Sequence, residues 1–471
     1  MLGKVFKAYD VRAIVPKPLN TRLAWQIGHG AARYLVESAQ EAGFDDPMMR
    51  HLAVGRDPRP TSPELGEALM AGIRAAGVSV IDLGVCDTPM IYFAVNHLAC
   101  AGGIQVTASH NPVEYNGFKF CGIGARPVGS GSGLETIREL AALADPDRAQ
   151  GTDEGRYETR DLWDAYARRL HGLLAEEAPE GLAATRGRPL KVVVDASNGS
   201  AGIMCPRLFD GLEGLEIVPI NFTCGDGHYE HEPNPLVEEN LDQLRAAVRD
   251  NQADLGVCFD GDADRCVVVD EAGRTVGGDL LTAWLVEPIL ERSPGTAVIF
   301  DLRSSRIVPE RITSLGGKPV PSRVGHVFMK AALAEHEAAF GGELSGHFYY
   351  RDMFGADSGS RAFVSVLGAL ARSDAPMSEQ VGRLRVYAQS GEVNFKNEDI
   401  EGTLASLRDV YSDAEFGEMD GLSIDTGGWW ANIRASNTEP LLRLNVEAAD
   451  QAAVDAALEE LGARLGTRVA H

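Results

Sequence analysis

Short apolar runs rich in β-branched residues alternate with amphipathic stretches along most of the chain. The first cycle reads HLAVGRD over 51–57, SPELGEALMAGIRAAG over 62–77, VSVIDLG over 78–84 and GGIQVTA over 102–108. Strands that alternate with helices in this way are typical of α/β sheets. For the first of these helices, Ser62 is the predicted N-cap, Pro63 the first residue and Gly77 the residue just past the end.

The same rhythm restarts twice and then gives way to a different pattern. The predicted strands lie at 191–199, 215–221 and 254–262, and then at 297–303, 318–320 and 338–346. After about residue 385 come GEVNF, GLSIDTGGWWANIRASN and LLRLNVEA, closed by a helical stretch over 451–465. We therefore predict three consecutive α/β domains, over 1–152, 153–272 and 273–380, and a smaller α+β domain with an antiparallel sheet over 381–471.

Charge and composition exclude several classes of partner. The 471 residues carry 44 Lys plus Arg against 68 Asp plus Glu, a formal net charge of −24 that repels nucleic acids and anionic membrane surfaces. The seven cysteines include no C-x-x-C pair, so neither a disulfide framework nor a zinc site is indicated. With no signal-peptide pattern at the N-terminus and no long apolar run, we expect a cytoplasmic protein. A ligand that is itself anionic would need a locally basic site.

Two segments that follow predicted strands carry candidate chemistry. T-A-S-H-N-P over 107–112 places Ser109 where α/β sheets present their ligand-binding loops, although an isolated loop serine usually makes only a turn hydrogen bond. D-G-D-A-D-R over 260–265 sets three carboxylates at alternate positions, and this oxygen-only set favours Mg²⁺. Glu271 at the twelfth position would suit an EF-hand, but Arg265 at the sixth position, where that loop requires glycine, and the strand-like flanks argue against one. A solvated acidic turn is the simpler alternative.

Two further segments are ambiguous when taken alone. G-E-L-S-G-H over 342–347 offers a carboxylate, a hydroxyl and an imidazole, a set that suits the hydroxyls of a sugar. R-A-S-N-T-E-P over 434–440 combines a guanidinium, an amide and hydroxyls in the manner of a phosphate clamp, with Arg443 nearby. A simple turn between two strands explains the second segment equally well.

Taken together and in this order, the four segments resemble the α-D-phosphohexomutase superfamily, most closely its phosphomannomutase/phosphoglucomutase branch. K-A-Y-D-V-R over 7–12, G-F-K over 117–119 and R-V-G-H over 323–326 also resemble motifs of that family. The resemblance implies three similar α/β domains with mixed sheets and a smaller fourth domain around a central cleft. One departure is Ala13, where the family usually has glycine, so a positive φ at this position would be strained.

The resemblance also implies a mechanism and a set of site residues. Ser109 would carry phosphate, pass it to the free hydroxyl of a hexose 1- or 6-phosphate, and recover it from a 1,6-bisphosphate intermediate. Mg²⁺ would be held by Asp260, Asp262 and Asp264 with the phosphorylated Ser109, and catalytic amounts of hexose 1,6-bisphosphate would activate the enzyme. His347 is the candidate general base, with Lys119 and Arg12 nearby. Substrate contacts are expected from Tyr9, Arg265, Arg323, His326, Glu343, Ser345, Arg434, Ser436, Asn437 and Thr438.

Three other functions remain open at this stage. A phosphoserine-based phosphatase would share the serine and the metal but would need no clamp for two substrate orientations. A non-catalytic module that binds sugar phosphates or calcium would not need Ser109. Phosphoglucosamine mutase is the nearest alternative, and that branch usually has glutamine where this chain has Leu344. The sequence leaves the preference between mannose and glucose, and the oligomeric state, undetermined.

Overall fold

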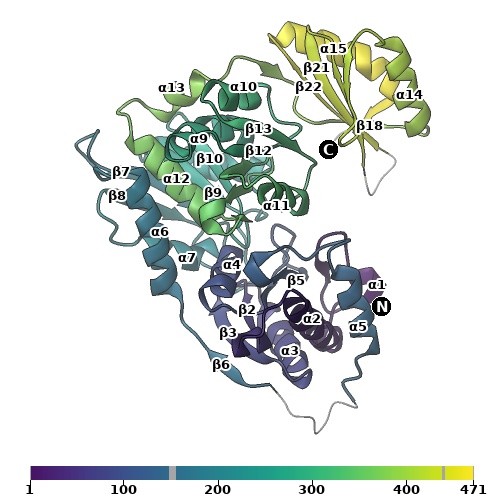
Figure 1. Cartoon of the computed structure of the whole chain (residues 1–471). Helices are drawn as coiled ribbons and strands as arrows, with labels where there is room; N and C mark the ends of the chain where they lie inside the picture. Colours follow the sequence, from purple (N-terminus) through teal and green to yellow (C-terminus); the bar gives the residue numbers. More distant parts are fainter. Residues whose placement is uncertain (1, 148–154, 437–440, 470–471) are drawn as a thin grey trace.

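The computed structural model describes residues 2–147, 155–436 and 441–469. These residues form four units, each built on one sheet, which we call domains I to IV in chain order (Figure 1). Domains I, II and III are α/β units with mixed sheets, and domain IV is a smaller α+β unit, so the predicted fold class is confirmed. Among the described helices, none combines the length and the apolar character that crossing a bilayer requires.

Domain I contains a sheet in the order β1-β5-β4-β2-β3-β6. Strands β4, β2, β3 and β6 are parallel, whereas β5 is antiparallel to β4 and β1 is antiparallel to β5. The strands are β1 Val11–Ile14, β2 His51–Arg56, β3 Ser79–Val85, β4 Gly102–Val106, β5 Tyr115–Gly122 and β6 Tyr157–Thr159. The α-helices are α1 Leu2–Val5, α2 Thr21–Glu41, α3 Ser62–Ala75, α4 Thr88–His97 and α5 Leu134–Leu143.

Domains II and III repeat this plan, with the orders β11-β10-β9-β7-β8 and β16-β15-β14-β12-β13. In each, three parallel strands are extended by two antiparallel ones. Domain II has β7 Leu190–Asp195, β8 Leu215–Ile220, β9 Leu255–Phe259, β10 Cys266–Asp270, β11 Thr275–Val276, α6 Trp163–Glu177, α7 Ala201–Phe209 and α8 Asp242–Asp250. Domain III has β12 Ala297–Asp301, β13 Lys318–Ser322, β14 Phe340–Gly342, β15 Phe348–Tyr350, β16 Ala356–Asp357, α9 Gly278–Arg292, α10 Ile307–Ser314, α11 His326–Glu335, α12 Gly359–Ala371 and α13 Met377–Gly382.

Domain IV is an antiparallel sheet in the order β19-β20-β21-β22-β18-β23, with β17 also paired to β22. It stands beside domain III and apart from domain I (Figure 1). Its elements are β17 Ala388–Gln389, β18 Val393–Lys396, α14 Ile400–Val410, β19 Glu415–Gly417, β20 Leu422–Asp425, β21 Trp429–Ala435, β22 Leu441–Ala448, α15 Gln451–Leu465 and β23 Thr467–Val469.

The burial pattern explains why the central strands read as unbroken apolar runs. Every residue of β9, β10 and β12 is buried, as expected for strands covered on both faces. The largest apolar cluster runs through domains II and III and includes α4 of domain I, whereas domain IV has a core of its own. One local prediction was wrong: α3 begins at Ser62, and Thr61 holds the N-cap position. The Ser62 hydroxyl instead donates to Asp57, because that carboxylate reaches it across the loop.

Candidate active site

Three of the predicted segments occupy the same place in three successive domains. Each joins the third parallel strand to its antiparallel neighbour: the segment with Ser109 joins β4 to β5, the segment with Asp260 joins β9 to β10, and the segment with Glu343 joins β14 to β15. Because these strands are arranged in the same order in the three sheets, each domain places one loop at the corresponding strand end. Two of the loops meet directly, since a Cβ built on Gly261 would lie 2.3 Å from the Ser109 carbonyl oxygen.

Ser109 sits in a strained and enclosed position. Its φ of 51° lies in the left-handed region, which a non-glycine residue adopts only when its surroundings hold it there. The backbone N–H donates to the Thr107 hydroxyl at 2.8 Å, and the Ser109 Oγ donates to Asp260 Oδ2 at 2.9 Å. The serine of domain I therefore points at the carboxylates of domain II.

A buried guanidinium that the sequence analysis missed holds the serine loop in this shape. Arg59 donates to the carbonyl oxygens of Ser109 and Asn111, at 2.8 and 2.7 Å. It also donates to the carbonyl oxygens of Pro112 and Tyr115 and pairs with Asp57. Arg59 is only 1% exposed, so it is part of the framework and does not contact solvent. No sequence pattern links it to a loop fifty residues away.

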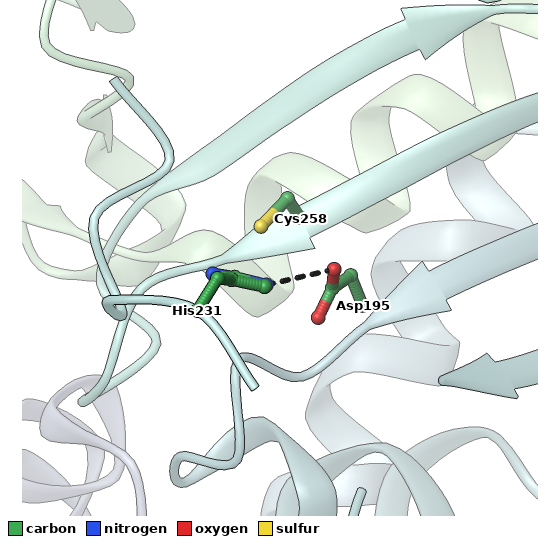
Figure 2. A group of neighbouring side chains, drawn as sticks. All are labelled: Asp195, His231 and Cys258. Atoms are coloured by element: carbon green, nitrogen blue, oxygen red, sulfur yellow. Dashed lines mark hydrogen bonds and ion pairs between the residues drawn. The ribbon is translucent and has the colours of Figure 1, made fainter. Parts of the chain in front are cut away.

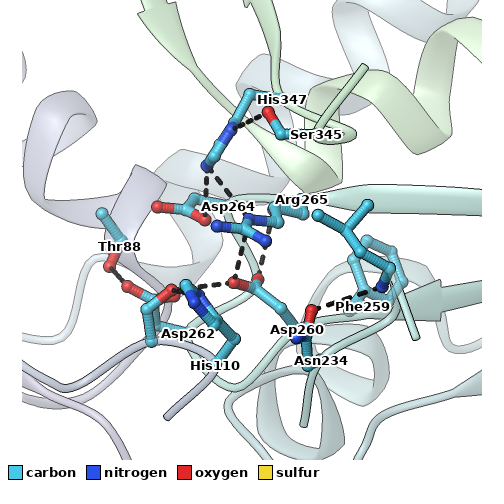
Figure 3. Close-up of polar contacts among 12 residues, drawn as sticks. Thr88, His110, Asn234, Phe259, Asp260, Asp262, Asp264, Arg265, Ser345 and His347 are labelled. Atoms are coloured by element: carbon cyan, nitrogen blue, oxygen red, sulfur yellow. Dashed lines mark hydrogen bonds and ion pairs between the residues drawn. The ribbon is translucent and has the colours of Figure 1, made fainter. Parts of the chain in front are cut away.

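The three aspartates converge as predicted. Asp260, Asp262 and Asp264 are buried, and one oxygen of each lies within 4.8 Å of the others (Figure 3). Lys119 donates to Asp262 Oδ2 at 2.7 Å and to Asp264 Oδ2 at 2.5 Å. Within the described residues, Asp262 Oδ1 is buried and accepts no hydrogen bond. An all-oxygen group with a free buried lone pair fits a hard divalent cation such as Mg²⁺.

Electrostatics also indicate that this group lacks positive charge. Burial, together with the charges of Asp264 and Asp262, raises the pKa of Asp260 to about 8. Burial acts in the same direction on Asp264, but Lys119 and His347 outweigh it and hold the pKa of that carboxyl well below its usual value. The same carboxylates raise the pKa of Lys119 despite its burial, so Lys119 stays protonated.

Domain I contacts this group through a second residue that the sequence analysis missed. Thr88, the first residue of α4, donates its hydroxyl to Asp262 Oδ2 at 2.6 Å and its backbone N–H to the Asp262 carbonyl oxygen at 2.9 Å (Figure 3). Both contacts cross from domain I to domain II. The hydroxyl contact uses Oδ2 of Asp262, whereas Oδ1 of the same carboxylate is buried and has no hydrogen-bond partner among the described residues.

Two imidazoles lie beside the three aspartates, one protonated and the other neutral. His347 Nε2 lies 3.3 Å from Asp264 Oδ1 and 3.3 Å from Arg265 Nε. Burial lowers the pKa of His347, but the charge of Asp264 outweighs it and raises the pKa to about 9. His110 lies with Nδ1 3.3 Å from Ser109 Oγ, and burial with the charge of Arg265 lowers its pKa to about 2. His347 therefore holds a proton at neutral pH, and His110 is neutral.

Glu343 and Ser345 both contact Nδ1 of His347. Glu343 is 2% exposed and accepts hydrogen bonds from the Gly325 N–H at 3.0 Å and from the Tyr349 hydroxyl at 2.7 Å. Ser345 Oγ lies 2.8 Å from His347 Nδ1. Burial raises the pKa of Glu343, but the hydrogen bond and charge of His347 outweigh it and lower the pKa to about 2. In this conformation both side chains orient His347.

The N-terminal motif also reaches the site. Arg12 donates to Asn111 of the serine loop at 2.6 Å and pairs with Asp10 at 2.6 Å. The Tyr9 ring packs edge-on against His326 of domain III, with centroids 5.4 Å apart. Ala13 lies in strand β1, opposite Asn116, and is not among the residues with positive φ. The strain considered for Ala13 is therefore absent.

A cavity of about 490 Å³ opens between domains I, II and III. It collects eight of the predicted residues: Tyr9, Arg12, Ser109, Lys119, Asp264, Arg265, His326 and His347. The cavity is also lined by Lys7 and His110, which stand in the quoted motifs but were given no role, and by Tyr92, Lys330 and Asp357, which the sequence analysis missed. Its lysines and arginines supply the local positive charge that an anionic ligand of this acidic protein requires. Arg323 does not line the cavity, because it is exposed and stacks on the Phe328 ring at 4.6 Å.

Two residues of the predicted phosphate clamp, Arg434 and Ser436, belong to the described part of domain IV, and neither lines this cavity. Arg434 is the last but one residue of strand β21, and its guanidinium pairs with Glu392 at 2.9 Å. Ser436 follows that strand, and Asn437 and Thr438 lie outside the described residues. Domain IV is joined to domain III by contacts such as Arg306 with Glu447 at 3.0 Å.

A second group of possible metal ligands lies in domain II, where Asp195, His231 and Cys258 come together (Figure 2). His231 Nε2 contacts Asp195 Oδ2 at 3.1 Å, and Nδ1 lies 2.7 Å from the Glu232 carbonyl oxygen. Burial and the charge of Asp195 raise the pKa of the Cys258 thiol well above its usual value. We interpret this group as an ion pair that anchors the loop after β8 to the end of β7.

Comparison with known proteins places all four domains. The chain matches the models of phosphoglucomutase/phosphomannomutase α/β/α domains I, II and III over 3–142, 173–273 and 277–387, and that of the C-terminal domain over 392–462. A relative described as phosphohexose mutases from Xanthomonas campestris pv. campestris is 40% identical and covers 95% of this chain and 96% of its own. A phosphomannomutase from Escherichia coli strain K12 is 36% identical, and the alignment covers 94% of both chains. The crystal structure of a phosphoglucomutase/phosphomannomutase family protein from Burkholderia thailandensis superposes with a TM-score of 0.84 at 32% identity, covering 98% of this chain and 96% of that one.

Proposed function

Because the chain belongs to the phosphoglucomutase/phosphomannomutase family and is a phosphohexose mutase, we propose that it transfers phosphate between the 1 and 6 positions of a hexose through Ser109. The substrate would be a mannose phosphate, a glucose phosphate or both. The observation that carries the proposal is the position of Ser109 Oγ, 2.9 Å from Asp260 Oδ2 in a cavity that also holds Lys119 and His347.

Phosphoryl transfer depends on alignment and on neutralised oxygen charge more than on covalent activation. In the first step the bond between Ser109 Oγ and phosphorus breaks, a bond forms from phosphorus to the free sugar hydroxyl, and that hydroxyl gives up its proton. In the second step the resulting 1,6-bisphosphate, bound the other way round, returns its other phosphate to Ser109. Lys119 and Arg265 are the cations that face the transferred group.

The metal proposed for this site is Mg²⁺, held by Asp260, Asp262 and Asp264 together with an oxygen on Ser109. When bound, it would neutralise charge on the phosphoryl oxygens. Two features support the assignment: the ligands are all oxygens, and Asp262 Oδ1 lacks a hydrogen-bond partner within the described chain. Lys119 and Thr88 both donate to Oδ2 of Asp262 and so fix the orientation of that carboxylate.

The two histidines are proposed to share the proton transfers. In the first step neutral His347 would accept the proton of the attacking sugar hydroxyl, and in the second step the resulting imidazolium would return it to the sugar oxygen that leaves phosphorus. Because its pKa is raised to about 9, only a small fraction of His347 is in the neutral form at neutral pH. His110 is neutral and lies 3.3 Å from Ser109 Oγ, so it can exchange a proton with the serine oxygen. Lys119 and Arg12 remain charged and orient the reacting groups.

Arg434 and Ser436 are proposed to bind the phosphate that does not react, together with Asn437 and Thr438. One clamp must serve both orientations of the bisphosphate. Because Arg434 does not line the cavity between domains I and III, domain IV would have to close over the bound sugar. Hexose 1,6-bisphosphate is expected to activate the enzyme by restoring phosphate to Ser109 whenever the intermediate escapes.

The experiment is a substrate panel run with a matched pair of variants. The purified enzyme is assayed with Mg²⁺ on mannose 1-phosphate, glucose 1-phosphate and glucosamine 1-phosphate, alongside Ser109→Ala and the control Ser314→Ala. Ser314 is an exposed residue at the end of α10. We expect turnover of the first or second sugar, its loss in Ser109→Ala only, and a mass increase of one phosphate on the wild type. Preference for glucosamine 1-phosphate would redirect the substrate assignment, and full activity of Ser109→Ala would reject the mechanism.

A further inference from the structure

Three guanidinium groups from two domains converge on a single carboxylate. Glu392 Oε2 accepts from Arg434 at 2.9 Å, and Glu392 Oε1 accepts from Arg443 at 3.2 Å. The third, Arg303 of domain III, brings its NH1 within 3.7 Å of Glu392 Oε2. Glu392 lies just before strand β18, in the stretch of chain that enters domain IV.

The strand register explains why an anion is needed at this point. Arg434 on β21 stands directly opposite Arg443 on β22. Like charges in directly opposed positions of an antiparallel pair destabilise it and push the side chains apart. The Glu392 carboxylate lies between the two and bonds one oxygen to each, so it neutralises the pair and draws both guanidinium groups to one side.

Stability alone does not account for this arrangement. The Glu392 side chain is 20% exposed and that of Arg443 is 32% exposed, and partly solvated ion pairs contribute little to folding. Arg434 commits NH2 to Glu392, whereas its Nε is buried and has no hydrogen-bond partner among the described residues. Part of its donor set therefore remains for another acceptor.

The contact with Arg303 extends the arrangement to domain III. Arg303 is fixed by two contacts with the Asp301 carboxylate at the end of β12. Burial lowers the pKa of Arg303, but the charge of Asp301 outweighs burial and raises it. A guanidinium anchored in this way provides a fixed point. Glu392 therefore links the position of Arg434 in domain IV to that of Arg303 in domain III. Domain III also contributes His326 and His347 to the cavity.

We propose that Glu392 is a positioning residue for the phosphate clamp, which holds Arg434 in the geometry that receives the non-reacting phosphate. The inference rests on the proposed role of Arg434. It predicts that Glu392 acts on substrate affinity through Arg434 and leaves the chemistry at Ser109 unchanged.

A double-mutant cycle tests this directly. The KM for the hexose 1-phosphate and the 6-phosphate, and kcat, are measured for Glu392→Ala, Arg434→Ala and the double variant. Glu398→Gln, a change at an exposed carboxylate a few residues away, is the control. We expect Glu392→Ala to raise both KM values about tenfold with kcat within about twofold, and to add nothing in the Arg434→Ala background. Glu392→Gln, which keeps the shape and one acceptor, should show a smaller rise and decides the matter if Glu392→Ala does not fold.

The outcomes separate the two proposals. If Arg434→Ala raises KM but the Glu392 variants do not, the positioning role is rejected and the clamp stands. Additive effects would mean that Glu392 acts independently of Arg434, which also rejects it. A fall in KM on removal of Glu392 would mean that its carboxylate competes with phosphate. If Arg434→Ala leaves KM unchanged, both the clamp and the role of Glu392 fail.

Discussion

Replacing Arg59 with lysine tests whether the shape of the serine loop depends on one buried guanidinium. Arg59 is 1% exposed and makes five side-chain hydrogen bonds, four of them to carbonyl oxygens from Ser109 to Tyr115. A lysine ammonium has three donors, so at least two acceptors lose their partner inside the protein. Hydrogen bonds to a charged group contribute about 1.5 to 3 kcal/mol each, which gives a local loss of about 3 to 6 kcal/mol.

The loss of these hydrogen bonds should unfold the loop from Ser109 to Tyr115 locally, while the rest of the chain stays folded. Amide hydrogen exchange at Asn111 and Tyr115, whose N–H groups bond to Ala108 and Pro112, should accelerate by at least about a hundredfold. We expect kcat to fall because Ser109 would no longer be held in the left-handed conformation that aims it at Asp260.

The matched control for this variant is Arg22→Lys. Its side chain is 56% exposed, and its pair with Asp147 lies at the surface, where such pairs contribute little to stability. If Arg59→Lys matched the wild type in both exchange and kcat, the guanidinium would not be what shapes the loop.

Three further predictions concern the metal group, its support and the anchor in domain II. Exhaustive chelation should abolish turnover, and Asp262→Asn should weaken Mg²⁺ binding by calorimetry at least about tenfold; an unchanged rate after chelation would contradict the metal assignment. Thr88→Val should weaken Mg²⁺ binding in the same assay while Thr88→Ser restores it; failure of serine to restore it would reject the hydrogen bond as the cause. Burial lowers the pKa of His231, but its hydrogen bond to Asp195 outweighs burial and raises the pKa. The pair therefore stabilises the folded protein fully at a pH below the pKa of a free imidazole. This stabilisation is lost as the pH rises through the raised pKa of His231. His231→Gln should therefore lower Tm more at about pH 6 than at about pH 9, unlike the exposed control His228→Gln; a difference that grew with pH would reverse the assigned sign.

The alternation of strands and helices predicted three α/β domains and a smaller α+β domain, and strands such as β9 are apolar throughout because both faces of the sheet are covered. The central cleft was predicted only from the family resemblance. The sequence also placed Ser109 and the three aspartates correctly at strand ends, where sheet geometry brings loops together. It could not predict the residues that act at long range. Arg59, Thr88 and Glu392 reach their partners across loops or domains, and nothing in their local spacing records it.

Charge states were equally inaccessible from the sequence. The family resemblance makes His347 the candidate general base. Burial lowers the pKa of His347, but the charge of Asp264 outweighs it and raises the pKa, and that contact exists only when domains II and III meet. The concern about Ala13 came from a family pattern, whereas the β1 pairing with β5 sets an extended backbone there. The sequence predicts that Arg434 binds phosphate, but it does not reveal that Arg434 pairs with Glu392. That pairing depends on the register of β21 and β22, which cannot be deduced from the residue type at one position.

The most direct test of the central claim is a single-turnover transfer from labelled enzyme. Enzyme carrying ³²P on Ser109 is mixed with unlabelled mannose 1-phosphate or glucose 1-phosphate, quenched within milliseconds, and the label is followed in protein, bisphosphate, monophosphate and free phosphate. Label should leave Ser109 and appear first in the hexose 1,6-bisphosphate, then in the 6-phosphate, at a rate no slower than kcat. Label that stays on the protein during turnover, or that appears as free phosphate at the rate of turnover, would contradict it.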